Sequence, residues 1–124
     1  MGRPAAYFSA MQKRNGHKYG AVPTEVDGIR FASKAEARRY GELKLLEKAG
    51  KISDLELQPR FELSVRRTLC APVKLGHYVA DFRYFDREAG QYVTEDVKGL
   101  KTPMYRWKKR HVEAQYGIAI TEVR

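Results

Sequence analysis

The stretch HYVADFRYF-DREAG-QYVTEDVK, residues 77–98, constrains the fold most, because it predicts an antiparallel hairpin. Apolar residues alternate with others through His77–Phe85, and this alternation predicts a strand. DREAG has the composition of a turn, and QYVTEDVK then returns as the partner strand. We therefore expect two paired strands whose side chains alternate between the two faces of a sheet.

The segments after this hairpin predict a helix and a closing strand. Thr102 suits the N-cap of a helix, Pro103 suits its first turn, and Gly117 suits its end after Tyr116. IAITEV, residues 118–123, is apolar enough for a buried strand. A strand, a helix and a strand in this order predict a right-handed parallel crossover.

The first part of the chain predicts a hairpin turn, one long helix and a further strand. Asp27-Gly28 is a turn signal, and the helix runs from an N-cap at Ser33 to a C-cap at Gly50. RFELSVR, residues 60–66, alternates as a strand, and residues 68–76 are predicted to be a loop. The expected fold class is α/β, more fully an α+β mixed sheet flanked by helices, with the core order α-β-β-β-α-β.

Length and composition favour one folded domain. We expect residues 21–124 to form a single domain and residues 1–20, which lack periodicity, to be a flexible basic arm. No apolar run approaches the roughly 20 residues of a membrane-spanning helix, so we expect no membrane partner. Cys70 is the only cysteine, which excludes an intrachain disulfide and favours a cytoplasmic location.

The formal net charge of +9 is concentrated in two segments. Residues 1–20 carry +4, residues 98–113 carry +5, and residues 21–97 are neutral overall. A basic segment beside a candidate site favours a polyanionic partner, most often nucleic acid. The residues that we expect to contact the backbone of DNA are Lys101, Thr102, Arg106, Lys108 and Lys109.

The second predicted helix is amphipathic, with one apolar and one charged arc. Lys108 falls inside the apolar arc, so it either extends along the apolar surface to solvent or reaches toward the site. We expect the apolar arc to pack on the sheet; its residues are Met104, Tyr105, Trp107, His111, Val112 and Tyr116.

Two acids and a lysine in the predicted hairpin form the main candidate site. Asp96 and Lys98 share one face of their strand, and pairing of the two strands can bring Asp81 beside Asp96. Two adjacent carboxylates repel one another unless a cation neutralises them, and Mg²⁺ prefers oxygen ligands of this kind. The alternative is structural: Lys98 pairs with Asp96, and Asp81 caps a turn or faces solvent. Glu95 lies on the opposite face and is excluded from the site.

Glu36 is a third acid with two possible roles. SKAE is a capping box, in which Ser33 and Glu36 satisfy backbone groups at the start of the first helix. Glu36 also shares a helical face with Tyr40 and Leu43, so it lies in line with residues directed to the core. Capping alone and capping combined with metal binding both remain open. Gln58, before Pro59, is either a hydrogen-bonded loop residue or a residue that supports the site or contacts the substrate.

The order of elements and these residues resemble the PD-(D/E)XK nuclease superfamily. The likeness extends to small phage- and prophage-encoded proteins assigned to it, which are similar to Holliday-junction resolvases. It covers residues 18–123 and rests on TEVDGIRFASKAEARRYGELKLLEKAGKISDLELQP, YVADF, EDVKG and YGIAI. Ala80 stands where the superfamily motif is named for a proline, and Asp96 fills the second acid position.

The resemblance implies a restriction-endonuclease-like core and a Mg²⁺-dependent endonuclease, with Mn²⁺ as a substitute ion. Asp81, Asp96 and Glu36 would be the metal ligands, and Lys98 would complete the catalytic set. The implied substrate is branched or structured phage DNA, such as a Holliday junction or a fork, inside the host bacterial cytoplasm. Members with that role usually act as homodimers, which makes a second copy of the chain an expected partner.

Two other functions compete with this one. The first is a nucleic-acid-binding module without catalysis, in which the acids form salt bridges. The second is nicking or exonuclease activity on unbranched DNA, and the choice between DNA and RNA as substrate stays open. The basic segments support binding in all of them, whereas only the cluster of acids distinguishes an enzyme from a binding module.

Overall fold

The structure, a computed structural model, describes residues 22–124. The predicted basic arm, residues 1–20, lies outside the described residues. The helices and strands are, in chain order, β1 (Thr24–Val26), β2 (Ile29–Phe31), α2 (Lys34–Lys48), β3 (Ile52–Leu57), β4 (Arg60–Arg67), β5 (Cys70–Val79), β6 (Phe82–Asp86), β7 (Gln91–Val97), α3 (Pro103–Tyr116) and β8 (Ile120–Val123).

The turn and capping residues of the first part of the chain act as the sequence predicts. Asp27 and Gly28 have φ values of 53° and 74°, and they join β1 to β2 in an antiparallel hairpin. The Ser33 hydroxyl accepts the backbone N–H of Glu36 and caps α2. Gly50 follows the C-cap residue and has a φ of 77°, so the helix ends within one residue of the predicted position.

A four-stranded mixed sheet with the strand order β3-β6-β7-β8 forms the centre of the molecule. β6 and β7 pair antiparallel, and β7 and β8 pair parallel with α3 between them, so the predicted hairpin and the predicted parallel pairing are confirmed. Thr102 caps α3, Pro103 occupies its first turn, and Gly117 ends it with a φ of 65°. The fold is thus a mixed α+β arrangement, as the sequence indicates.

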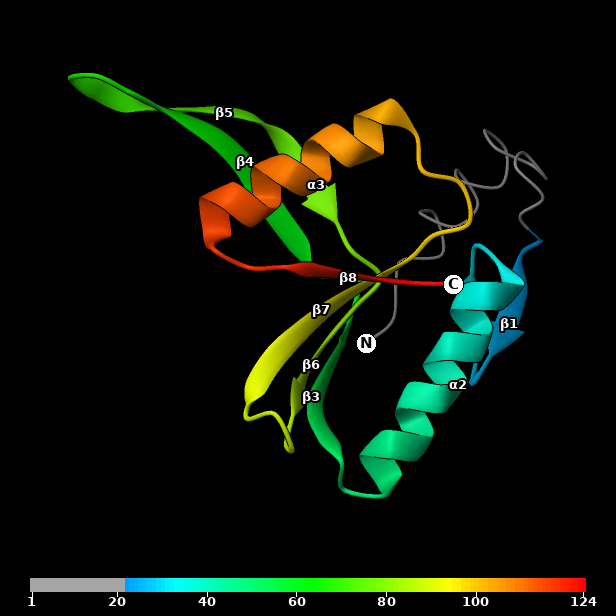
Figure 1. Cartoon of the computed structure of the whole chain (residues 1–124). Coiled ribbons are helices and arrows are strands. Elements are labelled where there is room, and N and C mark those ends of the chain that lie inside the picture. The colour runs from blue at the N-terminus through cyan, green and yellow to red at the C-terminus, as the bar shows by residue number, and fades with distance from the viewer. Residues whose placement is uncertain (1–21) are drawn as a thin grey trace.

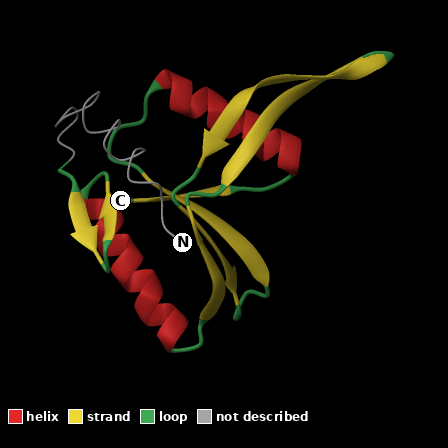
Figure 2. Cartoon of the chain, turned by 180° about the vertical axis from the view of Figure 1, so that it is seen from behind, coloured by secondary structure: helices red, strands yellow, loops and turns green. Residues whose placement is uncertain are grey.

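The prediction of a loop over residues 68–76 is wrong. Only Thr68 and Leu69 form a turn, and β5 begins at Cys70 and pairs with β4 in a separate two-stranded sheet. Figures 1 and 2 show this long hairpin projecting away from the central sheet. Pro72 is tolerated because, among residues 22–124, β5 pairs with β4 alone, and because the pairing shifts near this residue.

The prediction of one continuous strand over His77–Phe85 is also wrong, because the chain changes sheets inside it. β5 ends at Val79, and β6 begins at Phe82 in the central sheet. Ala80 packs with residues of β4, β5 and α3, whereas Phe82 packs against α2. Asp81 therefore lies at the point where the chain passes from one sheet to the other.

The sequence analysis also missed β3, the edge strand of the central sheet. Asp54 interrupts the strand with a φ of 56°, and the pairing with β6 shifts between Ser53 and Glu56. This irregularity hides the usual alternation of a strand. The central order of helix, three strands, helix and strand still holds, but its first strand is Ile52–Leu57 rather than residues 60–66.

Two hydrophobic clusters hold the elements together. The first joins α2 and the β1–β2 hairpin to one face of the central sheet, with Leu43 and Phe82 almost fully buried. The second joins α3, the β4–β5 hairpin and β8, with Val112 and Ala80 fully buried. Figure 1 shows α3 beside β4 and β5, and α2 beside β1. Within residues 22–124, no helix is long and apolar enough to cross a membrane.

The buried side of α3 differs from the predicted apolar arc. Tyr105 and Val112 are buried as predicted, but Met104 and Trp107 are 61% and 60% exposed. The helix packs mainly on the narrow β4–β5 hairpin and not on a broad sheet, so a narrower arc is covered. Lys109 and Glu113, both charged, are half-buried and face β8.

Candidate functional site

Strand pairing brings Asp81 and Asp96 together. Phe82 pairs with Glu95 in the β6–β7 ladder, so the next position places Asp81 opposite Asp96. The backbone N–H of Asp81 donates to the carbonyl of Glu95 at 3.0 Å. The carboxylate of Asp81 accepts the N–H of Val97 at 2.7 Å. The predicted proximity of the two acids is thus confirmed, and a backbone donor fixes one of them.

Asp96 is 2% exposed and is held by two side chains from different parts of the chain. The Tyr78 hydroxyl donates to its Oδ2 atom. The Nζ atom of Lys98 lies 3.6 Å from its Oδ1 atom and 4.3 Å from the centre of the Tyr105 ring. The ion pair of the structural alternative is therefore present between Lys98 and Asp96. Asp81, however, neither caps a turn nor faces solvent freely, because its carboxylate binds the backbone of β7.

Glu36 makes the predicted capping contact, and its carboxyl group lies near the acids of the sheet. Its backbone N–H donates to Ser33 at 3.2 Å, which is the predicted capping contact. Burial, followed by the negative charge of Asp96, raises the pKa of its carboxyl group to about 7. The positive charge of Lys98 and hydrogen bonds from Ala32 and Ser33 partly offset this rise. Ser33 thus caps α2 through the N–H of Glu36, and the carboxyl group of Glu36 interacts electrostatically with the acids of the sheet.

The three carboxyl groups form one cluster built from three elements. Glu36 comes from the first turn of α2, Asp81 from the segment before β6, and Asp96 from β7. The pKa of Asp81 is raised well above its usual range, first by burial and then by the charges of Glu36 and Asp96. Charged together, these groups repel one another, and Lys98 offsets only part of the repulsion.

A small cavity adjoins this carboxylate cluster on the side of the β1–β2 hairpin. Glu36 and Asp81 line it together with Gln58, whose backbone has a φ of 51°. The N–H of Gln58 donates to the carbonyl of Asp81 at 2.8 Å. The structure thus places Gln58, a candidate from the sequence, beside two of the three acids.

We expect the metal-free protein to lose stability as the pH rises from about 4.5 to 7. The pKa of Glu36 is about 7 in the folded chain and 4.5 in an ordinary exposed position, so the folded state binds more protons between these values. The loss should be on the order of 2 kcal/mol. Urea unfolding at several pH values measures it, and Glu36→Gln should reduce the dependence, because it removes the share of Glu36 and the repulsion that Glu36 exerts on Asp81. Glu88→Gln, in an exposed turn, is the matched control; an unchanged slope in Glu36→Gln would contradict the assignment.

The donor set fits an oxygen-preferring divalent cation. Carboxylates are ligands that Mg²⁺ and Mn²⁺ accept, and the repulsion among these three would be relieved by a positive ion. Within residues 22–124, no group of three His, Cys, Asp or Glu side chains already has the spacing of a metal site. Lys98 contacts Oδ1 of Asp96, and the Tyr78 hydroxyl donates to Oδ2. A metal ion bound to Asp96 would therefore replace its ion pair with Lys98.

Glu95 lies on the opposite face of β7, as alternation predicts. It is 1% exposed and receives hydrogen bonds from Arg39 at 2.8 and 2.6 Å and from the Tyr84 hydroxyl. These bonds connect α2 to the sheet. Sequence reasoning missed Arg39, because the partners are 56 residues apart and nothing local indicates the pair.

Of the five residues expected to contact DNA, two lie in one groove and three lie elsewhere. Lys101 and Arg106 line a groove of about 570 Å³ together with Lys98 and Arg124, at the end of β8. Lys101 also lies 2.9 Å from Glu122, whose pKa is lowered to about 2 by its hydrogen bonds to Lys101 and Tyr105. The groove is therefore basic and opens beside the lysine of the carboxylate cluster.

The other three predicted contacts are not assembled in this groove. The hydroxyl of Thr102 accepts the N–H of Tyr105 and serves as the helix cap. Lys109 lies between Glu113 and Glu122, at 3.9 and 3.5 Å. Lys108 is half-buried. Burial, then the charge of Arg60 and then the charge of Lys108 lower the pKa of His77, so the ammonium group of Lys108 lies near β5.

One family model matches most of the chain. Residues 16–122 match the family described as "Protein of unknown function (DUF1064)". No curated protein and no solved structure matches the chain. The matched range includes Glu36, Asp81, Asp96 and Lys98. It also includes the residues that line the basic groove, apart from Val123 and Arg124.

Proposed function

The chain belongs to the DUF1064 family, and from the geometry of its carboxylate cluster we propose that it is a divalent-metal-dependent endonuclease that hydrolyses phosphodiester bonds in DNA. One observation carries the proposal. Glu36, Asp81 and Asp96 come from three separate elements beside Lys98. Burial and the charge of Asp96 raise the pKa of Glu36, and burial and the charges of Glu36 and Asp96 raise the pKa of Asp81. Structural acids are usually paired individually, whereas a cluster of this kind is typical of a cation site.

The chain's own residues have distinct roles in this proposal. Asp81, Asp96 and Glu36 would hold Mg²⁺ or Mn²⁺, which polarises a phosphate and promotes ionisation of water. Lys98 would orient the attacking water or stabilise charge on the phosphate, and it already lies 3.6 Å from Asp96. Lys101 and Arg106 would bind neighbouring phosphates along the basic groove.

The order of elements supports a restriction-endonuclease-like core. α2, β3, β6, β7, α3 and β8 follow one another around the central sheet, and the β4–β5 hairpin is inserted between β3 and β6. The resemblance to the PD-(D/E)XK superfamily extends the proposal to branched or structured phage DNA, such as a Holliday junction or a fork. A homodimer with two sites would allow two strands to be cut.

Binding of nucleic acid without catalysis is the second candidate function. The ion pair between Lys98 and Asp96 favours it, because this contact neutralises one acid without a metal ion. The basic groove would serve both functions equally. The two candidates differ in what a divalent ion does to the protein.

Metal-linked stability distinguishes these candidates. We expect Mg²⁺ or Mn²⁺ to raise the free energy of unfolding by about 2.7 kcal/mol at a hundredfold excess over the dissociation constant. Asp81→Asn should abolish this gain while leaving the metal-free protein as stable or more stable, because it removes repulsion and keeps an acceptor for Val97. Urea unfolding with and without the ion measures both effects. Strong destabilisation of metal-free Asp81→Asn, with no response of the parent to either ion, would favour the binding module.

A further inference from the structure

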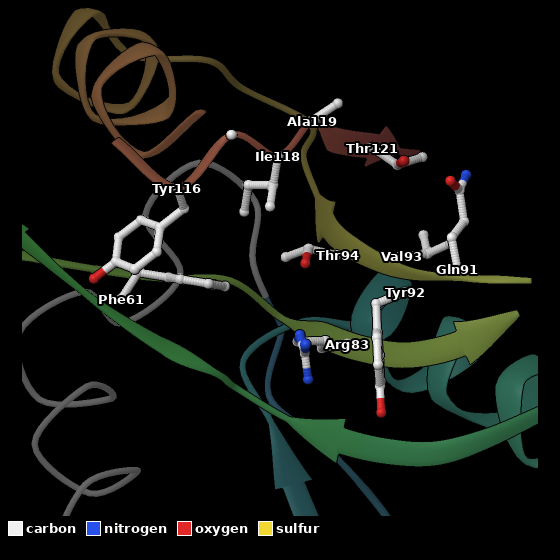
Figure 3. A pocket seen from close by; sticks show the side chains of 11 residues that line it. Phe61, Arg83, Gln91, Tyr92, Val93, Thr94, Tyr116, Ile118, Ala119 and Thr121 are labelled. Atoms are coloured by element: carbon white, nitrogen blue, oxygen red, sulfur yellow. The ribbon is translucent and has the colours of Figure 1, made fainter. Parts of the chain in front are cut away.

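A second cavity, of about 430 Å³, lies on the face of the central sheet away from α2. Figure 3 shows that its side chains come from four separate parts of the chain. Phe61 lies at the start of β4, and Tyr116 lies at the end of α3. Arg83 and Thr94 face each other across the β6–β7 ladder, and Tyr92 follows along the same face.

The cavity offers flat aromatic and guanidinium surfaces on two sides. The Arg83 guanidinium lies 4.0 Å from the centre of the Tyr92 ring, and its Nη1 atom lies 3.7 Å from a carboxylate oxygen of Glu56. Phe61 and Tyr116 meet edge to face, with ring centres 5.3 Å apart. Figure 3 shows the Thr94 hydroxyl between these two groups. Planar rings bind between surfaces of this kind by stacking and cation–π contact.

We propose that this cavity binds an unpaired nucleobase of the DNA strand that the carboxylate cluster cuts, an inference that rests on the proposed function. Proteins that hold single-stranded nucleic acid combine positive charge with aromatic side chains on which bases stack. A base inside a duplex is stacked on its neighbours and cannot enter such a cavity. The substrate class is thus DNA with unpaired nucleotides, such as forks, flaps and single strands, in preference to blunt duplex.

The cavity and the carboxylate cluster share a wall. The Phe61 ring packs on Tyr78 with ring centres 6.4 Å apart, and the Tyr78 hydroxyl donates to Asp96. Thr94 and Asp96 are two residues apart on one face of β7, a spacing of about 7 Å. A base held against Phe61 would therefore lie close to the acids, and it would press on the tyrosine that positions Asp96.

The test compares two single strands of equal length and charge, one with its bases and one built of abasic sites. The full chain is used in EDTA, so that no strand is cut, and binding is followed by fluorescence anisotropy. We expect the strand with bases to bind about 10-fold more tightly, the gain of one well-stacked base. Equal affinity for the two strands would overturn the proposal.

Variants locate the effect in the cavity. Tyr92→Ala and Arg83→Lys should reduce the 10-fold preference to near unity, because the first removes a ring and the second removes the planar group but keeps the charge. Tyr92→Phe loses only the hydrogen bond to Asp54 and should keep the preference. Arg30→Lys, on the exposed position of β2, is the matched control for Arg83→Lys. A preference that survives both cavity variants would overturn the assignment.

The source of the base is tested separately. Free deoxynucleoside monophosphates are added as competitors, and we expect no displacement of the strand at micromolar concentrations. Displacement at that level would overturn the assignment to a DNA strand. The result is independent of cleavage: a chain that cuts nothing can still prefer strands with bases, and a nuclease can cut without that preference.

Discussion

Replacing Asp96 with asparagine or Lys98 with alanine is expected to slow DNA cleavage by at least about 100-fold while leaving DNA binding largely intact. Asparagine keeps an acceptor for the Tyr78 hydroxyl but removes one charge from the carboxylate cluster. Alanine removes the ammonium group 3.6 Å from Asp96 and leaves the three acids in place. Both changes remove groups that act mainly on the transition state, so they should slow the chemical step. Binding should persist, because Lys101 and Arg106 remain in the basic groove.

Single-turnover cleavage with Mg²⁺ and binding in EDTA separate these two effects. Glu88→Gln makes the same chemical change as the acid variants at an exposed turn and should cut at the parental rate. Asp96→Asn can bind DNA more tightly than the parent in EDTA, because it repels phosphate less. Parental cleavage rates in both Asp96→Asn and Lys98→Ala would exclude this cluster as the catalytic site.

Arg39→Met is expected to destabilise the fold by about 3 kcal/mol, the largest stability effect among the changes considered. Arg39 donates two hydrogen bonds to Glu95, which is 1% exposed in the centre of the sheet. Methionine fills the space of the side chain but leaves the buried carboxylate without its positive partner. Urea unfolding measures the loss, and Arg38→Met, on the exposed side of the same helix, is the control.

The same contact predicts how Glu95 differs from Asp96. Glu95→Gln should lower stability, because it weakens the bond to Arg39, yet it should leave the cleavage rate of the folded protein nearly unchanged. If Arg39→Met lowers the free energy of unfolding by less than about 1 kcal/mol, the contact contributes no more than a salt bridge on the exposed surface, and the expectation is contradicted. Loss of cleavage in Glu95→Gln with retention in Asp96→Asn would contradict the strand register.

Local signals predicted the parts of the fold that depend on neighbouring residues. Ser33 and Thr102 cap their helices because each hydroxyl reaches an N–H three residues away. Asp27 and Gly28 form the predicted turn because both adopt positive φ values. The parallel pairing of β7 and β8 followed from a helix between two apolar strands.

The errors arose where long-range packing overrides the local pattern. Residues 77–85 alternate as one strand, but the chain changes sheets at Asp81, and no local residue indicates that change. Asp54 disturbs the alternation of β3 with a positive φ, so the strand was missed. Trp107 is exposed because α3 covers a narrow hairpin, a fact that a helical wheel does not contain.

The candidate site was predicted in outline and not in its supporting contacts. Alternation placed Asp96 and Lys98 on one face and Glu95 on the other, and pairing brought Asp81 beside Asp96. The hydroxyl of Tyr78, which binds Asp96 from a different sheet, was not foreseen. A contact between two sheets depends on the path of the whole chain, and strand periodicity carries no information about it.

Cleavage of DNA by the unaltered protein is the measurement that tests the central claim most directly. A four-way junction, a fork, a blunt duplex and a single strand, with an RNA strand as comparison, are incubated with Mg²⁺, Mn²⁺ or EDTA. The carboxylate cluster predicts metal-dependent cleavage of at least one DNA substrate, with branched or partly unpaired DNA cut fastest and no cleavage in EDTA. Binding of these DNAs without cleavage under either ion would contradict the claim and assign the chain to the nucleic-acid-binding modules.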